Sequence, residues 1–108
     1  VASDILFAPG KADLSSTAKQ TLSRVAQVLR REYANNQIVI EGHTDTDPIR
    51  KSKWASNQEL SDARADAVAA HLAQQGVPRA RMQTQGFGSS EPLETKAKSR
   101  RVEIVVLQ

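Results

Sequence analysis

The sequence contains no cysteine and few aromatic side chains, and no apolar run in it approaches the length of a membrane span. Without cysteine the chain can form neither disulfides nor thiolate sites, so cysteine usage does not indicate whether the protein works in an oxidising or a reducing compartment. Aromatic residues make up only 4% of the chain and no nucleic-acid-binding motif accompanies them, which argues against nucleic acid as a partner. A membrane-spanning helix needs about 20 consecutive apolar residues, and this sequence has no such stretch.

The composition is that of one globular domain spanning residues 1–108. Hydrophobic residues make up 39% of the chain and charged residues 25%, which are ordinary values for a folded domain. A second domain does not fit into 108 residues. No signal peptide opens the sequence, and Val1 lies almost directly before a strand-like segment. We therefore expect a domain excised from a longer protein, with any targeting or anchoring segment upstream.

Basic residues exceed acidic residues by 15 to 12, which gives a net charge of +3. The excess lies in three short clusters, which are Arg50, Lys51 and Lys53, then Arg79 and Arg81, and finally Lys96, Lys98, Arg100 and Arg101. A surplus of this size suits an anionic partner without identifying one.

Hydrophobic periodicity predicts strands and helices in the order β-α-β-α-β-β. The predicted strands are Asp4–Phe7, Gln37–Glu41, Met82–Gly86 and Val102–Leu107, and the predicted helices are Ser15–Tyr33 and Asn57–Gln75. This order favours the α+β class, as a two-layer sandwich in which two main helices cover one face of a mixed four-stranded sheet. The continuous apolar character of the last strand favours a central position for it.

The stretch that organises the chain begins with a short apolar strand, Ile38–Ile40, which ends in the polar turn Gly42–Asp45. In open sheets covered by helices, ligands usually bind in the crevice beyond the carboxyl ends of the strands. Asp45 is therefore a candidate for a ligand-binding residue. A polar loop follows, which Trp54 is expected to pin to the body of the domain.

Arg64 lies on the apolar stripe of the second predicted helix, together with Leu60, Val68 and Leu72. A guanidinium on the face that packs against a sheet needs an anionic acceptor, and Asp45 is the nearest candidate in the predicted topology. Two interpretations stay open at this point. The two side chains form either a structural ion pair or the two halves of a ligand site.

Four stretches of the sequence occur in a fixed order and carry a family resemblance. They are Ile40–Asp45 (IEGHTD), Asn57–Leu72 with Leu60, Ser61, Arg64, Ala65 and Val68, Gln85–Gly88 (QGFG) followed by Pro92, and Arg100–Ile104 (RRVEI). Together they resemble the OmpA-like peptidoglycan-binding domain, and the match covers essentially the whole chain. The segments Phe7–Leu14 and Asp45–Ser61 are most similar to the periplasmic part of the flagellar stator protein MotB.

The resemblance implies non-covalent binding of peptidoglycan, which anchors a parent envelope protein, such as a flagellar stator subunit, to the cell wall. In the family, the acid after the GHT turn and the arginine of the following helix hold the diaminopimelate residue of a stem peptide. These roles fall on Asp45 and Arg64, and Asn57, Arg100 and Thr44 complete the implied site. The implied location is the periplasm of a Gram-negative bacterium, with the parent protein anchored in the inner or outer membrane. No cofactor is implied.

The chemistry of the implied ligand agrees with these residue types. The free end of meso-diaminopimelate carries an ammonium beside a carboxylate, so Asp45 can accept from the first and Arg64 can donate to the second. The sequence departs from the family in two places. Ala8 stands where many members have an acid, which removes one auxiliary contact, and the segment between Pro92 and Arg100 is short, with Ser99 where asparagine is usual.

Two other classes of function compete with wall binding. An enzyme would need His43, Asp45 and a serine as a hydrolytic set, or His43, Asp45 and Asp47 as metal ligands. Neither spacing suits these sites and no serine lies on a GxSxG turn, so we expect no catalysis. The alternative that stays open is an interaction module that forms a homodimer through an exposed sheet or helix face, with wall binding secondary.

Overall fold

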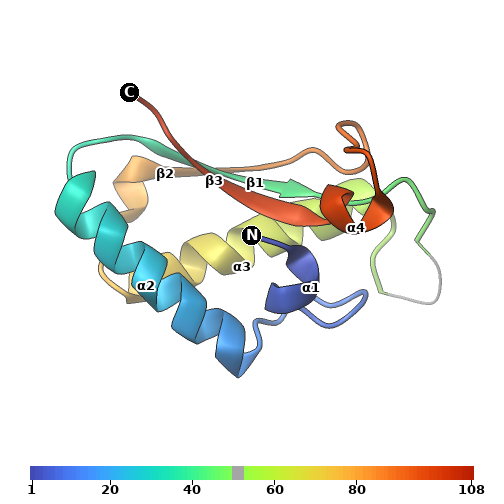
Figure 1. Ribbon diagram of the computed structural model, residues 1–108, viewed down its shortest axis with the longest axis horizontal. Coiled ribbons are helices and arrows are strands. Elements are labelled where there is room, and N and C mark those ends of the chain that lie inside the picture. Colours follow the sequence, from blue (N-terminus) through green and yellow to red (C-terminus); the bar gives the residue numbers. More distant parts are fainter. Residues whose placement is uncertain (50–52) are drawn as a thin grey trace.

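The computed structural model describes residues 1–49 and 53–108. Arg50 and Lys51 of the first basic cluster lie outside these described residues. The elements follow one another as α1 (Ser3–Leu6), α2 (Ser16–Glu32), β1 (Ile38–His43), α3 (Asn57–Gln74), the 3₁₀ turn η1 (Arg79–Arg81), β2 (Met82–Gly86), α4 (Lys96–Ser99) and β3 (Arg101–Val106). Figure 1 shows two layers, with the sheet above and the two long helices α2 and α3 on its lower face. The predicted α+β class with two main helices on one face of a mixed sheet is thereby confirmed.

The sheet is built around β1 (Ile38–His43). On one side β1 pairs in parallel with β2 (Met82–Gly86), and on the other side it pairs antiparallel with β3 (Arg101–Val106). The antiparallel register places His43 opposite Arg101. Arg100 is the residue before β3 and Thr44 is the residue after β1. Because the two strands run in opposite directions, Arg100 lies beside Thr44.

The two long helices begin at serine caps. Ser15 Oγ accepts from the N–H of Ala18 at 3.0 Å at the start of α2 (Ser16–Glu32). Ser56 Oγ accepts from the N–H of Glu59 at 3.1 Å at the start of α3 (Asn57–Gln74). The hydrophobic core fills the space between these helices and the inner face of the sheet. It includes Leu22, Ala26 and Leu29 of α2, Ala65, Val68 and Leu72 of α3, and Ile38 and Ile40 of β1.

The first segment of the chain is helical where the sequence predicts the strand Asp4–Phe7. The structure has the short helix α1 (Ser3–Leu6), and the N–H of Phe7 donates to the carbonyl of Ser3 at 2.8 Å. Ser3, Leu6 and Phe7 are buried whereas Asp4 and Ile5 are exposed. This spacing of three and four is that of a helical turn and not the alternation of a strand. The sheet in the described residues consequently has three strands and not four.

The central position predicted for the last strand is also wrong, because β1 is the central strand and β3 lies at an edge. The first residues of the chain cover part of this edge. The N–H of Val102 donates to the carbonyl of Val1 at 2.9 Å, and Ala2 forms an isolated bridge with Arg101. These contacts bring α1 next to the start of β3, although nearly the whole chain separates them in sequence.

Two paired glycines allow α3 to approach the sheet closely at the carboxyl end of β1. Gly42 of β1 lies opposite Gly86 of β2, and both face Ser61 of α3. A Cβ added at Gly42 would lie 3.0 Å from the carbonyl carbon of Ser61 and closer still to its oxygen. A Cβ added at Gly86 would meet Ser61 Oγ and the main chain of Asp62. Because neither glycine has a side chain, α3 can lie close to the sheet, and this distance fixes where Arg64 lies relative to the end of β1.

Gly42→Ala is expected to destabilise the domain, because the new methyl group meets helix backbone that cannot rotate away. We expect a loss of about 1–3 kcal/mol in the free energy of unfolding, measured from urea denaturation followed by circular dichroism. The matched control is Gln85→Ala, an exposed position next to Gly86, with an expected change within about 0.5 kcal/mol. Equal midpoints for Gly42→Ala and the wild type would contradict this account of the close approach.

Candidate functional site

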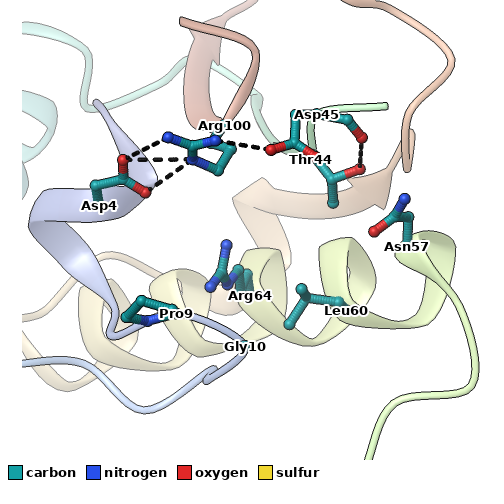
Figure 2. A pocket seen from close by; sticks show the side chains of 9 residues that line it. All are labelled: Asp4, Pro9, Gly10, Thr44, Asp45, Asn57, Leu60, Arg64 and Arg100. Carbon is teal, nitrogen blue, oxygen red and sulfur yellow. Dashed lines mark hydrogen bonds and ion pairs between the residues drawn. The ribbon is translucent and has the colours of Figure 1, made fainter. Parts of the chain in front are cut away.

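A pocket of about 330 Å³ opens where the carboxyl end of β1 meets the first turns of α3 (Figure 2). This volume is near the lower end of the range for small-molecule sites, about 300–1,000 Å³. Four segments far apart in the sequence supply its walls. The lining residues are Asp4, Pro9, Gly10, Thr44, Asp45, Asn57, Leu60, Arg64 and Arg100. Every site residue predicted from the sequence is in this set, and Asp4, Pro9, Gly10 and Leu60 are the lining residues that the sequence analysis missed.

Arg64 rises from the second turn of α3 and is 5% exposed. Its Nε donates to the carbonyl of Lys11 at 2.8 Å and its Nη2 to the carbonyl of Ala8 at 3.3 Å. The guanidinium carbon lies 4.8 Å from the centre of the Phe7 ring. None of the hydrogen bonds found within the described ranges uses Nη1 of Arg64. The side chain is thus held by main-chain carbonyls and a ring, and it lines the pocket.

The electrostatic setting of Arg64 is unusual for an arginine. Burial lowers the pKa of the Arg64 guanidinium from its ordinary value. The negative charge of Asp4 raises the pKa of Arg64, and the positive charge of Arg100 lowers it further. A cation that is desolvated in this way gains more from an anionic ligand than an exposed one does, because water competes less for its hydrogen bonds.

Asp45 does not pair with Arg64, so the structural ion pair considered for these two residues is not present. Instead, Asp45 Oδ2 accepts from Arg100 Nη1 at 2.7 Å, and Asp45 Oδ1 accepts from the N–H of Asp47 at 3.0 Å. The sequence did not reveal this partner, because the pairing depends on the antiparallel register of β1 and β3. The carboxylate of Asp45 is mostly buried, with 14% of the side chain exposed.

Arg100 also binds the acid that the sequence analysis missed. Its Nε lies 3.1 Å from Asp4 Oδ1 and 3.3 Å from Oδ2, and its Nη2 lies 3.0 Å from Oδ2. Figure 2 shows the guanidinium of Arg100 between the two carboxylates of Asp4 and Asp45. These hydrogen bonds raise the pKa of Arg100, with the bonds to Asp4 as the larger cause.

Thr44 and Asn57 fix the loop that carries Asp45. The N–H of Thr44 donates to the carbonyl of Gly88 at 2.8 Å, and its Oγ1 donates to the carbonyl of Asp45 at 2.8 Å. Asn57 Nδ2 donates to the carbonyl of Asp47 at 2.9 Å. Farther along, Trp54 Nε1 donates to the carbonyl of Gly10 at 2.9 Å, which confirms that Trp54 pins this loop to the domain.

His43 is not part of the pocket. Its side chain leaves β1 on the outer face of the sheet, where it stacks on Phe87 with ring centres 5.0 Å apart. The Nε2 atom lies 3.7 Å from a carboxylate oxygen of Glu41 and 3.9 Å from one of Glu103. The structure therefore does not bring His43 and Asp45 together, as the hydrolytic and metal-binding alternatives require.

Two further structural findings bear on the class of protein. Within residues 1–49 and 53–108, no group of three or more His, Cys, Asp or Glu side chains is placed to hold a metal ion. No helix in the same ranges has the length and apolar character that a membrane crossing requires.

The sequence and the fold match proteins of the cell envelope. The peptidoglycan-associated lipoprotein of Agrobacterium fabrum is 39% identical over 89 residues, which cover 82% of this chain and 48% of the lipoprotein. The cell wall anchor of the T6SS from Pseudomonas aeruginosa matches in structure with a TM-score of 0.89 and 34% identity, over 98% of this chain and 77% of that chain. A putative MotB like protein from Desulfovibrio vulgaris matches with a TM-score of 0.91 and 30% identity, over 98% and 69% of the respective chains.

This chain spans about half the length of the curated relatives it matches. The resemblance to MotB inferred from the loops is confirmed by the likeness of the folds. The model of the OmpA family matches residues 6–104, which is nearly the whole domain and includes most of the pocket. The chain belongs to the OmpA family.

Proposed function

We propose that this domain binds peptidoglycan non-covalently and thereby anchors a parent envelope protein to the cell wall. The family membership supports this function, as do the printed names of two relatives, a peptidoglycan-associated lipoprotein and a cell wall anchor. The observation that carries the proposal is the state of Arg64. Among the described residues, main-chain carbonyls and a ring hold this buried guanidinium beside the pocket, and such a guanidinium is suited to a carboxylate ligand.

The finer proposal is that the ligand is the free end of meso-diaminopimelate in a stem peptide. This end carries an ammonium and a carboxylate on one carbon atom, so its site needs an anion and a cation on facing walls. In our proposal the carboxylate accepts from Arg64 Nη1, and the ammonium donates to Asp45. Each such charge-assisted hydrogen bond contributes about 1.5–3 kcal/mol.

The charges of the pocket favour a zwitterion over a simple ion. Asp4 and Asp45 supply two negative charges, and Arg64 and Arg100 supply two positive charges. A ligand with a net negative charge would meet both acids, and one with a net positive charge would meet both arginines. Thr44 and Asn57 take part by holding the Asp45 loop in position, and Arg100 takes part through its contact with Asp45.

We extend the proposal to the setting of the domain. The relatives include a lipoprotein and a MotB like protein, which supports a place in the periplasm of a Gram-negative bacterium, on a parent protein anchored in the inner or outer membrane. A flagellar stator subunit is the more specific parent that the MotB-like fold supports. A homodimer of the domain is compatible with this function, because two copies would hold the wall with higher avidity than one.

Retention on isolated sacculi tests the function directly. We expect wild-type protein to sediment with peptidoglycan, and Asp45→Ala and Arg64→Ala to lose roughly 10- to 100-fold in apparent affinity, because each removes one charged partner of the zwitterion. Asp13→Ala and Arg24→Ala are matched controls for charge, since both residues are exposed and lie outside the pocket. Equal retention of the wild type and the two pocket variants would reject the proposed site.

The conservative variant Arg64→Lys separates guanidinium geometry from charge. We expect it to bind nearly as poorly as Arg64→Ala, because a lysine ammonium lacks the planar fork in which Nε and Nη2 donate to the carbonyls of Lys11 and Ala8 while Nη1 is left for a carboxylate. Titration of each variant with a soluble stem peptide that ends in meso-diaminopimelate gives the comparison. Affinity of Arg64→Lys within about two-fold of the wild type would mean that a positive charge alone suffices.

A further inference from the structure

Asp4, which the sequence analysis did not identify as a site residue, forms hydrogen bonds with Arg100 at the edge of the pocket. Asp4 binds the side edge of the Arg100 guanidinium, formed by Nε and Nη2, through three contacts of 3.0–3.3 Å. Asp45 binds the opposite end, through Nη1 alone. The two carboxylates thus divide one guanidinium between them, and Asp4 has the larger share of its donors.

The main chain fixes Asp4 and Arg100 relative to each other independently of their side chains. The N–H of Ser3, the residue before Asp4, donates to the carbonyl of Arg100 at 2.9 Å. Ser3 and Leu6 on either side of Asp4 are buried, so α1 is anchored while Asp4 itself points toward the pocket rim. The side chain of Asp4 is 58% exposed and that of Arg100 is 32% exposed. Asp4 is therefore placed to orient Arg100 without being buried in the core.

The orientation of Arg100 decides how much of Asp45 is available to another cation. With its side edge on Asp4, Arg100 reaches one oxygen of Asp45 through one nitrogen. A guanidinium whose side edge has no partner is free to form the stronger two-point pairing with a carboxylate. If Arg100 turned that edge onto Asp45, it would bind Oδ1, which now accepts from the N–H of Asp47, as well as Oδ2. An ammonium from a ligand would then have to compete with a bidentate arginine.

We propose that Asp4 is a positioning residue for ligand binding, which holds the side edge of Arg100 and so keeps Asp45 accessible to the ammonium of the ligand. This inference rests on the proposed function, because it concerns the same pocket and the same zwitterionic ligand. Asp4 acts through Arg100 and does not touch the ligand. An exposed ion pair contributes little to folding, so the effect of Asp4 is on binding and not on the stability of the domain.

A double-mutant cycle tests this role with Asp4→Asn, Arg100→Gln and the double variant. The probe is the soluble tripeptide L-Ala-γ-D-Glu-meso-diaminopimelate, titrated by calorimetry or by NMR. We expect Asp4→Asn to raise the Kd about 3- to 10-fold in the wild-type background, by freeing Arg100 to engage Asp45 fully. In the Arg100→Gln background the same change is expected to alter the Kd less than about two-fold.

The control variant is Asp13→Asn, which removes the same charge from an exposed position outside the pocket. Urea midpoints of Asp4→Asn and Asp13→Asn are expected to match the wild type, which separates binding from folding. An unchanged Kd for Asp4→Asn would overturn the inference, and so would an equal loss in both backgrounds, which would make Asp4 a direct ligand contact. If the wild type binds the tripeptide and Asp45→Ala does not, either of these results rejects the role of Asp4 alone. Failure of the wild type to bind would reject the proposed function together with it.

Discussion

The burial of the Arg64 guanidinium beside two main-chain carbonyls is the constraint on which the rest of the site depends. A desolvated charge is costly unless hydrogen bonds compensate it, and here the carbonyls of Ala8 and Lys11 do so in part. They fix the loop after α1 against α3, while the paired glycines Gly42 and Gly86 let α3 approach the sheet. The hydrogen bonds that compensate for the desolvation of Arg64 also hold its side chain where it lines the pocket.

The two arginines of the pocket have different partners, and the proposed function gives them different roles. Arg100 is neutralised by Asp4 and Asp45 and joins three segments, namely α1, the loop after β1 and the start of β3. Arg64 has carbonyls and the Phe7 ring around it and retains its capacity to bind a carboxylate. In the proposed function, this division lets a pocket with two positive and two negative side chains bind a ligand that carries both charges close together. It also explains why charge composition alone says little about the function of the domain.

Local sequence signals predicted the part of the site that local structure builds. The apolar stripe of α3 and the turn after β1 were sufficient to place Asp45 and Arg64 in one crevice. The family resemblance added Thr44, Asn57 and Arg100, all of which line the pocket. The positions of Asp45 and Arg64 could be predicted because a strand end and a helix start are determined by residues close together in the chain.

The remaining features depend on contacts between distant segments, which a single sequence does not reveal. Asp4 and Arg100 are 96 positions apart, and the helical turn of α1 was mistaken for a strand because four residues carry too weak a pattern to separate the two. The pairing of Asp45 with Arg100 follows from the register of β1 and β3, and the edge position of β3 follows from the order of the strands.

A crystal structure of the domain with bound meso-diaminopimelate would reveal which atoms of Arg64 and Asp45 contact the ligand. We expect the ligand carboxylate within hydrogen-bonding distance of Arg64 Nη1 and the ligand ammonium within hydrogen-bonding distance of the Asp45 carboxylate, with the contacts of Arg64 to Ala8 and Lys11 retained. A ligand bound elsewhere on the domain, or bound in this pocket with its carboxylate away from Arg64, would contradict this expectation.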